Sequence, residues 1–209
     1  MQLEKIFRVQ LALVCVLAAG CSTSQPERSQ RTFTDLQHLS KLLIAGEEQI
    51  TTLNMALLAI SKAKATDVRD VYTAFNFEFQ RTQKLAAKVN EQIEDLRGNA
   101  EIYFDTWKKQ ANRLGNADLK SMSLERQRLV QQDFANVMTA VNAMSGLGKP
   151  YGADLTDLQT FLGNDLTRAG STLAKPFVKK ILASSEPFLD ALRTAQDEVQ
   201  NLATVLQPK

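Results

Sequence analysis

The fold is decided by residues 68–107, VRDVYTAFNFEFQRTQKLAAKVNEQIEDLRGNAEIYFDTW. Mostly apolar residues recur through this stretch every three or four residues, and we call this row of residues a seam. The seam consists of Val68, Tyr72, Phe75, Phe79, Thr82, Ala86, Val89, Ile93, Leu96, Ala100, Tyr103 and Trp107. This spacing puts side chains on one face of an α-helix. We predict one helix that begins at Thr66 and Asp67 and runs to about Leu114, with Gly98 as a bend point. At 1.5 Å per residue it would be about 70 Å long, which favours an elongated bundle.

The preceding segment carries a second seam. Thr34-Asp35-Leu36-Gln37 matches a capping box, with Thr34 as the N-cap of a helix. The seam then continues at 3.5-residue spacing through Leu36, Leu39, Leu43, Ile50, Leu53, Leu57 and Ile60, with Gly46 as the gap. Such heptad-like spacing indicates packing against other long helices.

The residues after Gly115 and Asn116, the predicted stop of the long helix, carry two or three further helices. A third helix is expected within residues 118–145, and residues 146–152 (GLGKPYG) form the plainest loop. A fourth segment follows, which Gly163, Gly170 and Pro176 would kink or split. Ser184 and Ser185 can cap a last helix. Each of these segments carries its own row of apolar residues, or stripe. The stripe of the third helix is Val130, Phe134, Val137, Val141 and Met144. The fourth segment has Leu155, Leu158, Leu162, Leu166, Ala169 and Leu173, and the last helix has Phe188, Leu192, Ala195, Val199, Leu202 and Leu206.

No stretch alternates long enough to predict a strand. The fold class is therefore all-α, an elongated antiparallel bundle of four to five long helices with heptad-like seams.

The N-terminus has the pattern of a lipoprotein signal peptide. Lys5 and Arg8 precede an uncharged apolar run at residues 11–19, which is too short to span a bilayer. The sequence Leu17-Ala18-Ala19-Gly20-Cys21 resembles the lipobox of bacterial lipoproteins, in which the cysteine is lipidated and cleavage precedes it. An ordinary secretory signal is the alternative. We expect a removed signal peptide at 1–20, a lipidated flexible tether at 21–33 and a helical-bundle domain at 34–209.

The expected location of the protein is the cell envelope. By resemblance to enterobacterial sorting, Ser22 after the lipidated cysteine indicates the outer membrane, facing the periplasm. The other cysteine, Cys15, lies in the segment that would be removed, so the mature chain would hold neither a free thiol nor a disulfide. The net charge of +2 is too small to indicate a nucleic acid partner.

No residue set matches a catalytic, cofactor-binding or metal-binding pattern. His38 is the only histidine, and a zinc site would need several ligands at suitable spacing. We expect His38 to lie on the surface or close to the tether. Nucleophile elbows and phosphate loops are missing. Phe77 and Phe104 lie off the seam, so their helix either is central in the bundle, which we favour, or exposes a patch for a partner.

Part of the chain, roughly residues 71–206, resembles a family. Gln92-Ile93-Glu94-Asp95-Leu96, Tyr103-Phe104-Asp105-Thr106-Trp107, residues 119–129 and Asp157-Leu158-Gln159-Thr160-Phe161-Leu162 carry the resemblance. The family is an uncharacterised group of bacterial lipoproteins and secreted helical proteins, described only as a domain of unknown function. Where its members have Lys-His-Asn-Leu-Asn, this chain has Gly163-Asn164-Asp165-Leu166-Thr167, and only the leucine matches. The resemblance implies the helical fold and the location in the cell envelope, and it implies no enzymatic activity.

Two functions fit these observations, and neither is enzymatic. In the first, an outer-membrane lipoprotein acts as a helical spacer, adaptor or protein-interaction module, with the membrane bound through Cys21 and an envelope protein or a second copy as partner. In the second, a helical module of the periplasm binds a small molecule or lipid in an apolar pocket, which residues 163–176 would line. A cavity of several hundred Å³ between the helices would favour the second, and a tightly filled interior would exclude it.

Overall fold

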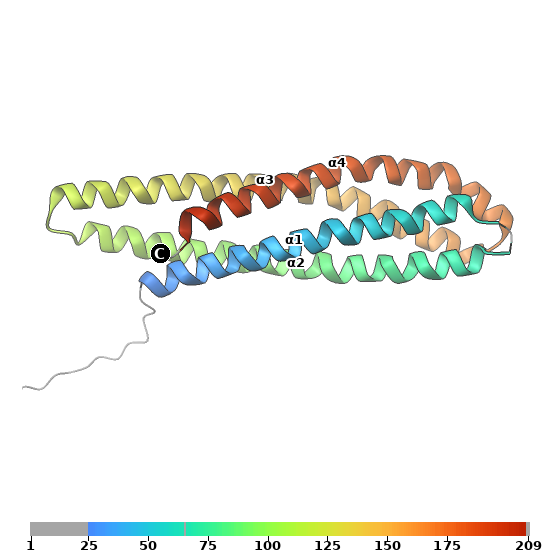
Figure 1. Ribbon diagram of the computed structural model, residues 1–209, viewed down its shortest axis with the longest axis horizontal. Coiled ribbons are helices and arrows are strands. Elements are labelled where there is room, and N and C mark those ends of the chain that lie inside the picture. Colours follow the sequence, from blue (N-terminus) through green and yellow to red (C-terminus); the bar gives the residue numbers. More distant parts are fainter. Residues whose placement is uncertain (1–24, 65, 208–209) are drawn as a thin grey trace, which may run out of the picture.

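Four antiparallel helices form a rod in the computed structural model, which describes residues 25–64 and 66–207 (Figure 1). The helices are α1 (Gln25–Lys62), α2 (Val68–Asn112), α3 (Ala117–Asn164) and α4 (Arg168–Leu206). The predicted all-α elongated antiparallel bundle is confirmed, with four helices. None of the helices in the described ranges is both long and apolar enough to cross a bilayer.

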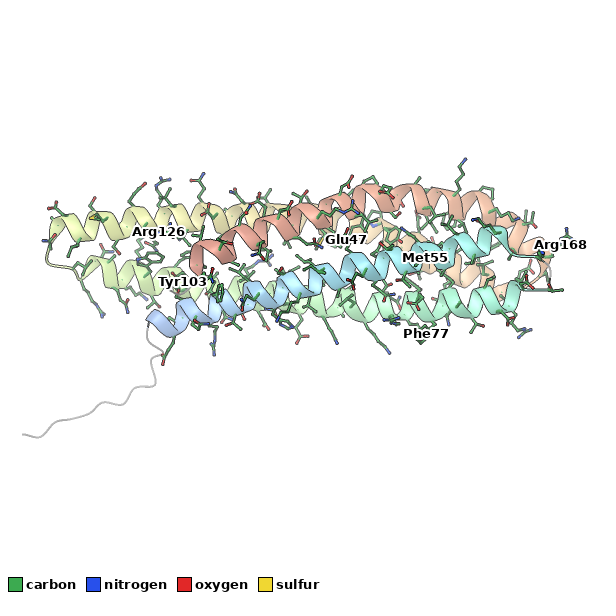
Figure 2. The ribbon with its side chains drawn as sticks, in the orientation of Figure 1. Glu47, Met55, Phe77, Tyr103, Arg126 and Arg168 are labelled. Carbon is green, nitrogen blue, oxygen red and sulfur yellow. The ribbon has the colours of Figure 1, made fainter. Side chains whose placement is uncertain are left out.

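The helices pack in a ring that is incomplete on one side. The pairs α1–α2, α3–α4 and α1–α4 pack closely, whereas α2 and α3 make far fewer contacts with each other. An ion pair joins α4 to α1, with Arg193 Nε 2.7 Å from Glu47 Oε1 (Glu47 is labelled in Figure 2). One edge of the bundle, between α2 and α3, is therefore open over part of its length.

The core is divided into two sections along the rod. The seam predicted for α1 is buried throughout, since all seven of its apolar residues are at most 4% exposed. Its first three leucines belong to the section nearer the start of α1, and the four residues from Ile50 to Ile60 belong to the other section. Phe188 of α4 packs against both sections, so the sections meet at mid-length.

The α1 helix begins nine residues before the predicted N-cap. Thr34 is not a cap; its Oγ1 donates to the carbonyl of Gln30 at 2.9 Å, inside the helix. The predicted tether boundary at residue 33 is therefore wrong for residues 25–33, which are helical. Thr32 is buried and Phe33 packs against the core, so docking against the bundle extends a helix whose first turns are polar.

Residues 146–152, predicted as the plainest loop, lie inside α3. Gly148 allows α3 to pack closely against α4, because a Cβ at this position would lie 3.0 Å from Cε2 of Phe188. Tyr151 is 3% exposed, and its burial holds the segment against the bundle. Packing thus outweighs the helix-breaking tendency of Pro150 and the glycines.

The break between the last two helices lies at residues 165–167, between Gly163 and Gly170, in the segment that was predicted to be kinked or split. Thr167 is the N-cap of α4, and its Oγ1 accepts from the amide of Gly170 at 3.1 Å. The chain folds back so tightly that a Cβ on Gly170 would lie 2.4 Å from the carbonyl oxygen of Asp165. The break changes the phase of the stripe, which leaves Leu173, a predicted core residue, 70% exposed.

The helix α4 then continues through both of its prolines, and Ser185 does not cap a new helix. Ser185 is 1% exposed and its Oγ donates to the carbonyl of Leu182 at 2.7 Å. The apolar face of α4 runs past Pro176 and Pro187, which explains why the helix is not split.

The favoured central position of α2 is wrong, and its two off-seam aromatic residues have different environments. Phe104 is 7% exposed and lies against Phe134 of α3, with ring centroids 5.8 Å apart. Phe77 is 60% exposed and points away from the bundle (Figure 2). The guanidinium of Arg81 lies 5.8 Å from the centroid of the Phe77 ring.

Candidate binding groove between α2 and α3

A cavity of about 600 Å³ lies at mid-length, where α2 and α3 separate. We call it the α2–α3 groove. Its walls are residues 79–97 of α2 and 141–155 of α3, and α1 and α4 supply the floor. These walls correspond to a length of about 20–27 Å along the helices. The volume falls within the range of pockets that bind small molecules and cofactors.

The groove has an apolar interior and a polar rim. The interior is made by Leu43, Ile50, Phe79, Val89, Ile93, Val141, Met144, Tyr151, Leu155, Phe188 and Leu192. The rim consists of exposed polar side chains, which are Gln83, Asn90, Glu94, Arg97, Asn142 and Lys149. Since the two core sections meet here, the groove gives solvent access to the joint between them.

Polar contacts join α2 and α3 beyond both ends of the groove. At the end nearer the α2–α3 turn, Gln127 Nε2 donates to the carbonyl of Phe104 at 2.7 Å. At the other end, Gln159 Nε2 donates to Asn76 Oδ1, and the hydroxyl of Tyr72 lies 3.4 Å from the carbonyl of Gln159. The helices are therefore tied on either side of the cavity, and the separation between the ties is a defined feature of the fold.

Small side chains on both walls explain why the helices do not meet. On α2, Thr82 and Ala86 continue the seam at the cavity, and neither is buried. On α3, Gly148 and Gly152 line the opposite wall. A Cβ on Gly152 would meet nothing within 4 Å, so the space beside it is open. The sequence shows the small seam residues of α2, but it does not show that the glycines of α3 lie across from them.

A buried polar chain crosses the bundle beneath the groove. The hydroxyl of Tyr151 donates to Asn54 Oδ1 at 3.0 Å, and Asn54 Nδ2 donates to Ser185 Oγ at 2.9 Å. This chain joins α3, α1 and α4. Burial raises the pKa of Tyr151, so its hydroxyl remains protonated and acts as a donor at neutral pH.

His38 occupies a structural position outside the groove. It is exposed, as predicted, and its Nδ1 lies 2.6 Å from Oε1 of Gln92. The amide nitrogen of Gln92 donates to the carbonyl of Asp35 at 3.3 Å, so the Gln92 oxygen is the acceptor and His38 donates from Nδ1. This contact joins α1 to a buried amide of α2.

The other predicted site positions lie elsewhere. Cys21, the predicted lipidation site, is outside the described residues. Residues 163–176, which were predicted to line a pocket, do not line the α2–α3 groove. Within residues 25–64 and 66–207, no three His, Cys, Asp or Glu side chains gather as a metal site would require.

Comparison with known proteins gives one match. No curated protein and no solved structure matches the chain. A family described as "Protein of unknown function (DUF2959)" matches residues 34–203. This range contains both walls and the floor of the groove. Because the match covers well over half of the sequence, the chain belongs to this family of proteins of unknown function.

Proposed function

We propose that this protein is a lipid-anchored, non-enzymatic binding module of the cell envelope, whose α2–α3 groove holds the acyl chain of an amphiphilic molecule. The observation that supports the proposal is the cavity of about 600 Å³, which has an apolar interior and a polar rim. The lipoprotein pattern at Cys21 supports the location, which we take to be the outer membrane facing the periplasm.

The dimensions of the groove favour a narrow occupant. Its walls extend along about 20–27 Å of helix, so an occupant that fills the groove is elongated. An acyl chain is narrow and flexible, and each buried methylene contributes about 0.8 kcal/mol. A chain laid along the groove would cover Met144, Ile93 and Phe188 while its polar head stays at the rim.

The charges at the rim suit an anionic head group. Lys149 lies on the α3 wall, and Arg97 lies on the α2 wall, 2.8 Å from Glu94. A carboxylate or a phosphate at the rim would interact with either cation. A fatty acid and a phospholipid share this chemistry, so both are used as probes below.

The test is binding of a fluorescent fatty acid to the full mature chain, with Gly152→Phe as the blocking variant. The new ring would fill open space inside the groove. Gly146→Phe is the matched control, since Gly146 lies on the same helix, has equally open space and does not line the cavity. We expect Gly152→Phe to weaken binding at least tenfold and Gly146→Phe to bind as wild type.

Competition experiments distinguish a free fatty acid from a phospholipid as the source of the bound acyl chain. Unlabelled palmitate should displace the probe if free fatty acid is the ligand, and a short-chain phosphatidylglycerol should displace it if the ligand is a phospholipid. Equal binding by wild type and Gly152→Phe, with both variants folded by circular dichroism, would contradict the proposal.

The anchor is tested separately. Cells expressing the Cys21→Ser variant should incorporate no labelled palmitate into the protein, whereas wild type should incorporate it. Labelling that persists in the variant would refute anchoring through Cys21 and would leave the groove proposal standing.

A spacer or adaptor role is the second candidate, and the length of the helices favours it. Helices of 45 and 48 residues without interruption are far longer than the average of about 12 residues in globular proteins. A rod of this length can hold a partner away from the membrane. Photo-crosslinking from position 77 in intact envelopes would test for a partner, and an envelope protein that is crosslinked from position 77 but not from the exposed Leu129 would support this role.

A further inference from the structure

The turn between α2 and α3 extends past the rest of the bundle, as Figure 1 shows at its left end. We call residues 107–122 the hairpin tip. The α4 helix ends before it, since Arg126 Nη2 donates to the carbonyl of Val205 at 3.2 Å. The α1 helix also begins level with its base. Ser29 lies beside the side chain of Tyr103, and because α1 and α2 are antiparallel, Gln25 lies level with Trp107.

The hairpin tip exposes large apolar side chains. Leu114 is 41%, Leu119 is 55% and Met122 is 68% exposed. The tip is nevertheless ordered, because Trp107 Nε1 donates to Ser123 Oγ at 3.0 Å and Ala111 is buried between the helices. Three exposed apolar side chains on a small, rigid projection are the feature of a surface that binds something apolar.

Basic side chains surround these apolar residues. Between residues 107 and 122 the acidic residue is Asp118, and the basic residues are Lys108, Lys109, Arg113 and Lys120. Lys109 forms an ion pair with Asp105 at 2.6 Å, at the base of the tip. Apolar side chains beside an excess of Lys and Arg match the surface of a bilayer that contains anionic lipids.

The first residue of α1 lies at this same end of the bundle (Figure 1). Cys21 is four residues before Gln25, so the cysteine lies within about 14 Å of the helix start. From Trp107 to Leu114 the tip advances about 10 Å beyond that level. A lipid on Cys21 and the apolar residues of the hairpin tip can therefore reach the same membrane plane.

We propose that the hairpin tip is a membrane-docking element, which places Leu114, Leu119 and Met122 in the interface of an anionic bilayer beside the acyl chains on Cys21. This inference rests on the proposed lipid anchor. Two attachment points fix the orientation of the rod, so that it stands away from the membrane and its far end, where α1 ends and α4 begins, points into the periplasm.

Trp107 is the only tryptophan in the sequence and lies at the base of the tip, so its fluorescence reports on docking. The lipidated mature protein is reconstituted into vesicles of phosphatidylethanolamine and phosphatidylglycerol whose acyl chains carry bromine, a collisional quencher. We expect at least a twofold loss of Trp107 emission relative to unbrominated vesicles. Flotation of the same samples reports on the lipid anchor.

The double variant Leu119→Glu with Met122→Glu should float with the vesicles but lose the quenching. The matched control is Met55→Glu with Leu173→Glu, which adds the same charge at apolar residues that are 59% and 70% exposed and lie outside the tip. The control should keep the quenching.

Each outcome decides a specific point. Flotation of wild type without quenching, or quenching that the tip variant retains, would overturn the docking inference and leave the anchor intact. Wild type that fails to float would overturn the anchor, and the inference with it. Flotation with quenching that only the tip variant loses would support both.

Discussion

The hydroxyl of Tyr151 lies in the middle of the bundle, where it donates to Asn54 and so connects α3 to α1. Replacing Tyr151 with Phe leaves the amide oxygen of Asn54 without this donor. We expect Tyr151→Phe to lower the free energy of unfolding by about 1–2 kcal/mol. Tyr72→Phe is the control, because its contact with the Gln159 carbonyl is long at 3.4 Å, and its loss should be smaller. Urea denaturation measures both, and equal losses would show that the buried chain is not stabilising.

The same residue predicts how stability depends on alkaline pH. Burial raises the pKa of Tyr151 above its ordinary value of 10.0. The unfolded chain then loses its phenolic proton at lower pH than the folded chain, so the stability from this group is complete below pH 10 and declines above it. Wild type should therefore lose more stability than Tyr151→Phe as the pH rises past about 10. Parallel declines would contradict the burial of this hydroxyl.

Two glycines in the helices should respond differently to alanine. A Cβ on Gly98 would meet nothing within 4 Å, so Gly98→Ala should raise the free energy of unfolding by about 0.5–1 kcal/mol through helix propensity. At Gly148 the new methyl would press on the ring of Phe188, and the gain should be smaller or reversed. Chemical denaturation of the two variants checks this. If Gly148→Ala stabilised as much as Gly98→Ala, close packing would not be the reason for that glycine.

At the scale of the helices, the caps show where α1 and α3 begin. Asn116 has an extended backbone and its side chain accepts from the amide of Leu119 at 2.9 Å, so Asn116→Ala should cost about 1 kcal/mol of stability. Thr34 lies inside α1, where alanine is the better helix former, so Thr34→Ala should be neutral or stabilising. Thermal unfolding of both variants measures the difference. A loss at Thr34 equal to that at Asn116 would place the start of α1 at Thr34 instead.

The helices themselves were largely predictable from their seams. All seven seam residues of α1 are buried, and α2 ends at Asn112, two residues before the predicted Leu114. The breaks were less predictable, because glycine and proline signal both loops and close helix contacts. Gly148 serves such a contact, whereas Thr167, which does begin a helix, was not identified from the sequence. Whether a glycine or proline marks a loop or a close helix contact depends on the neighbouring helix. The sequence of one segment does not show which helix packs beside it.

At the scale of the whole molecule, the length of the rod is directly measurable. The 48 residues of α3 correspond to about 70 Å. A rod of that length has a radius of gyration of at least about 20 Å, whereas a compact chain of this size would have about 17 Å. Small-angle scattering of the mature chain should give the larger value at all protein concentrations tested. A value near that of a compact globule would contradict the extended packing of the four helices.

The sequence by itself determined the secondary structure class and the elongated shape, because the spacing of apolar residues is a local property of the chain. The pattern of the N-terminus is also local, and it predicts lipid attachment at Cys21. Only the tertiary structure decided where α1 begins, that residues 146–152 stay helical, and where the bundle is open. The physical reason is that the groove exists between helices. Thr82 and Ala86 are unremarkable members of a seam until two glycines of α3 lie across from them, and no pattern within either helix specifies that meeting.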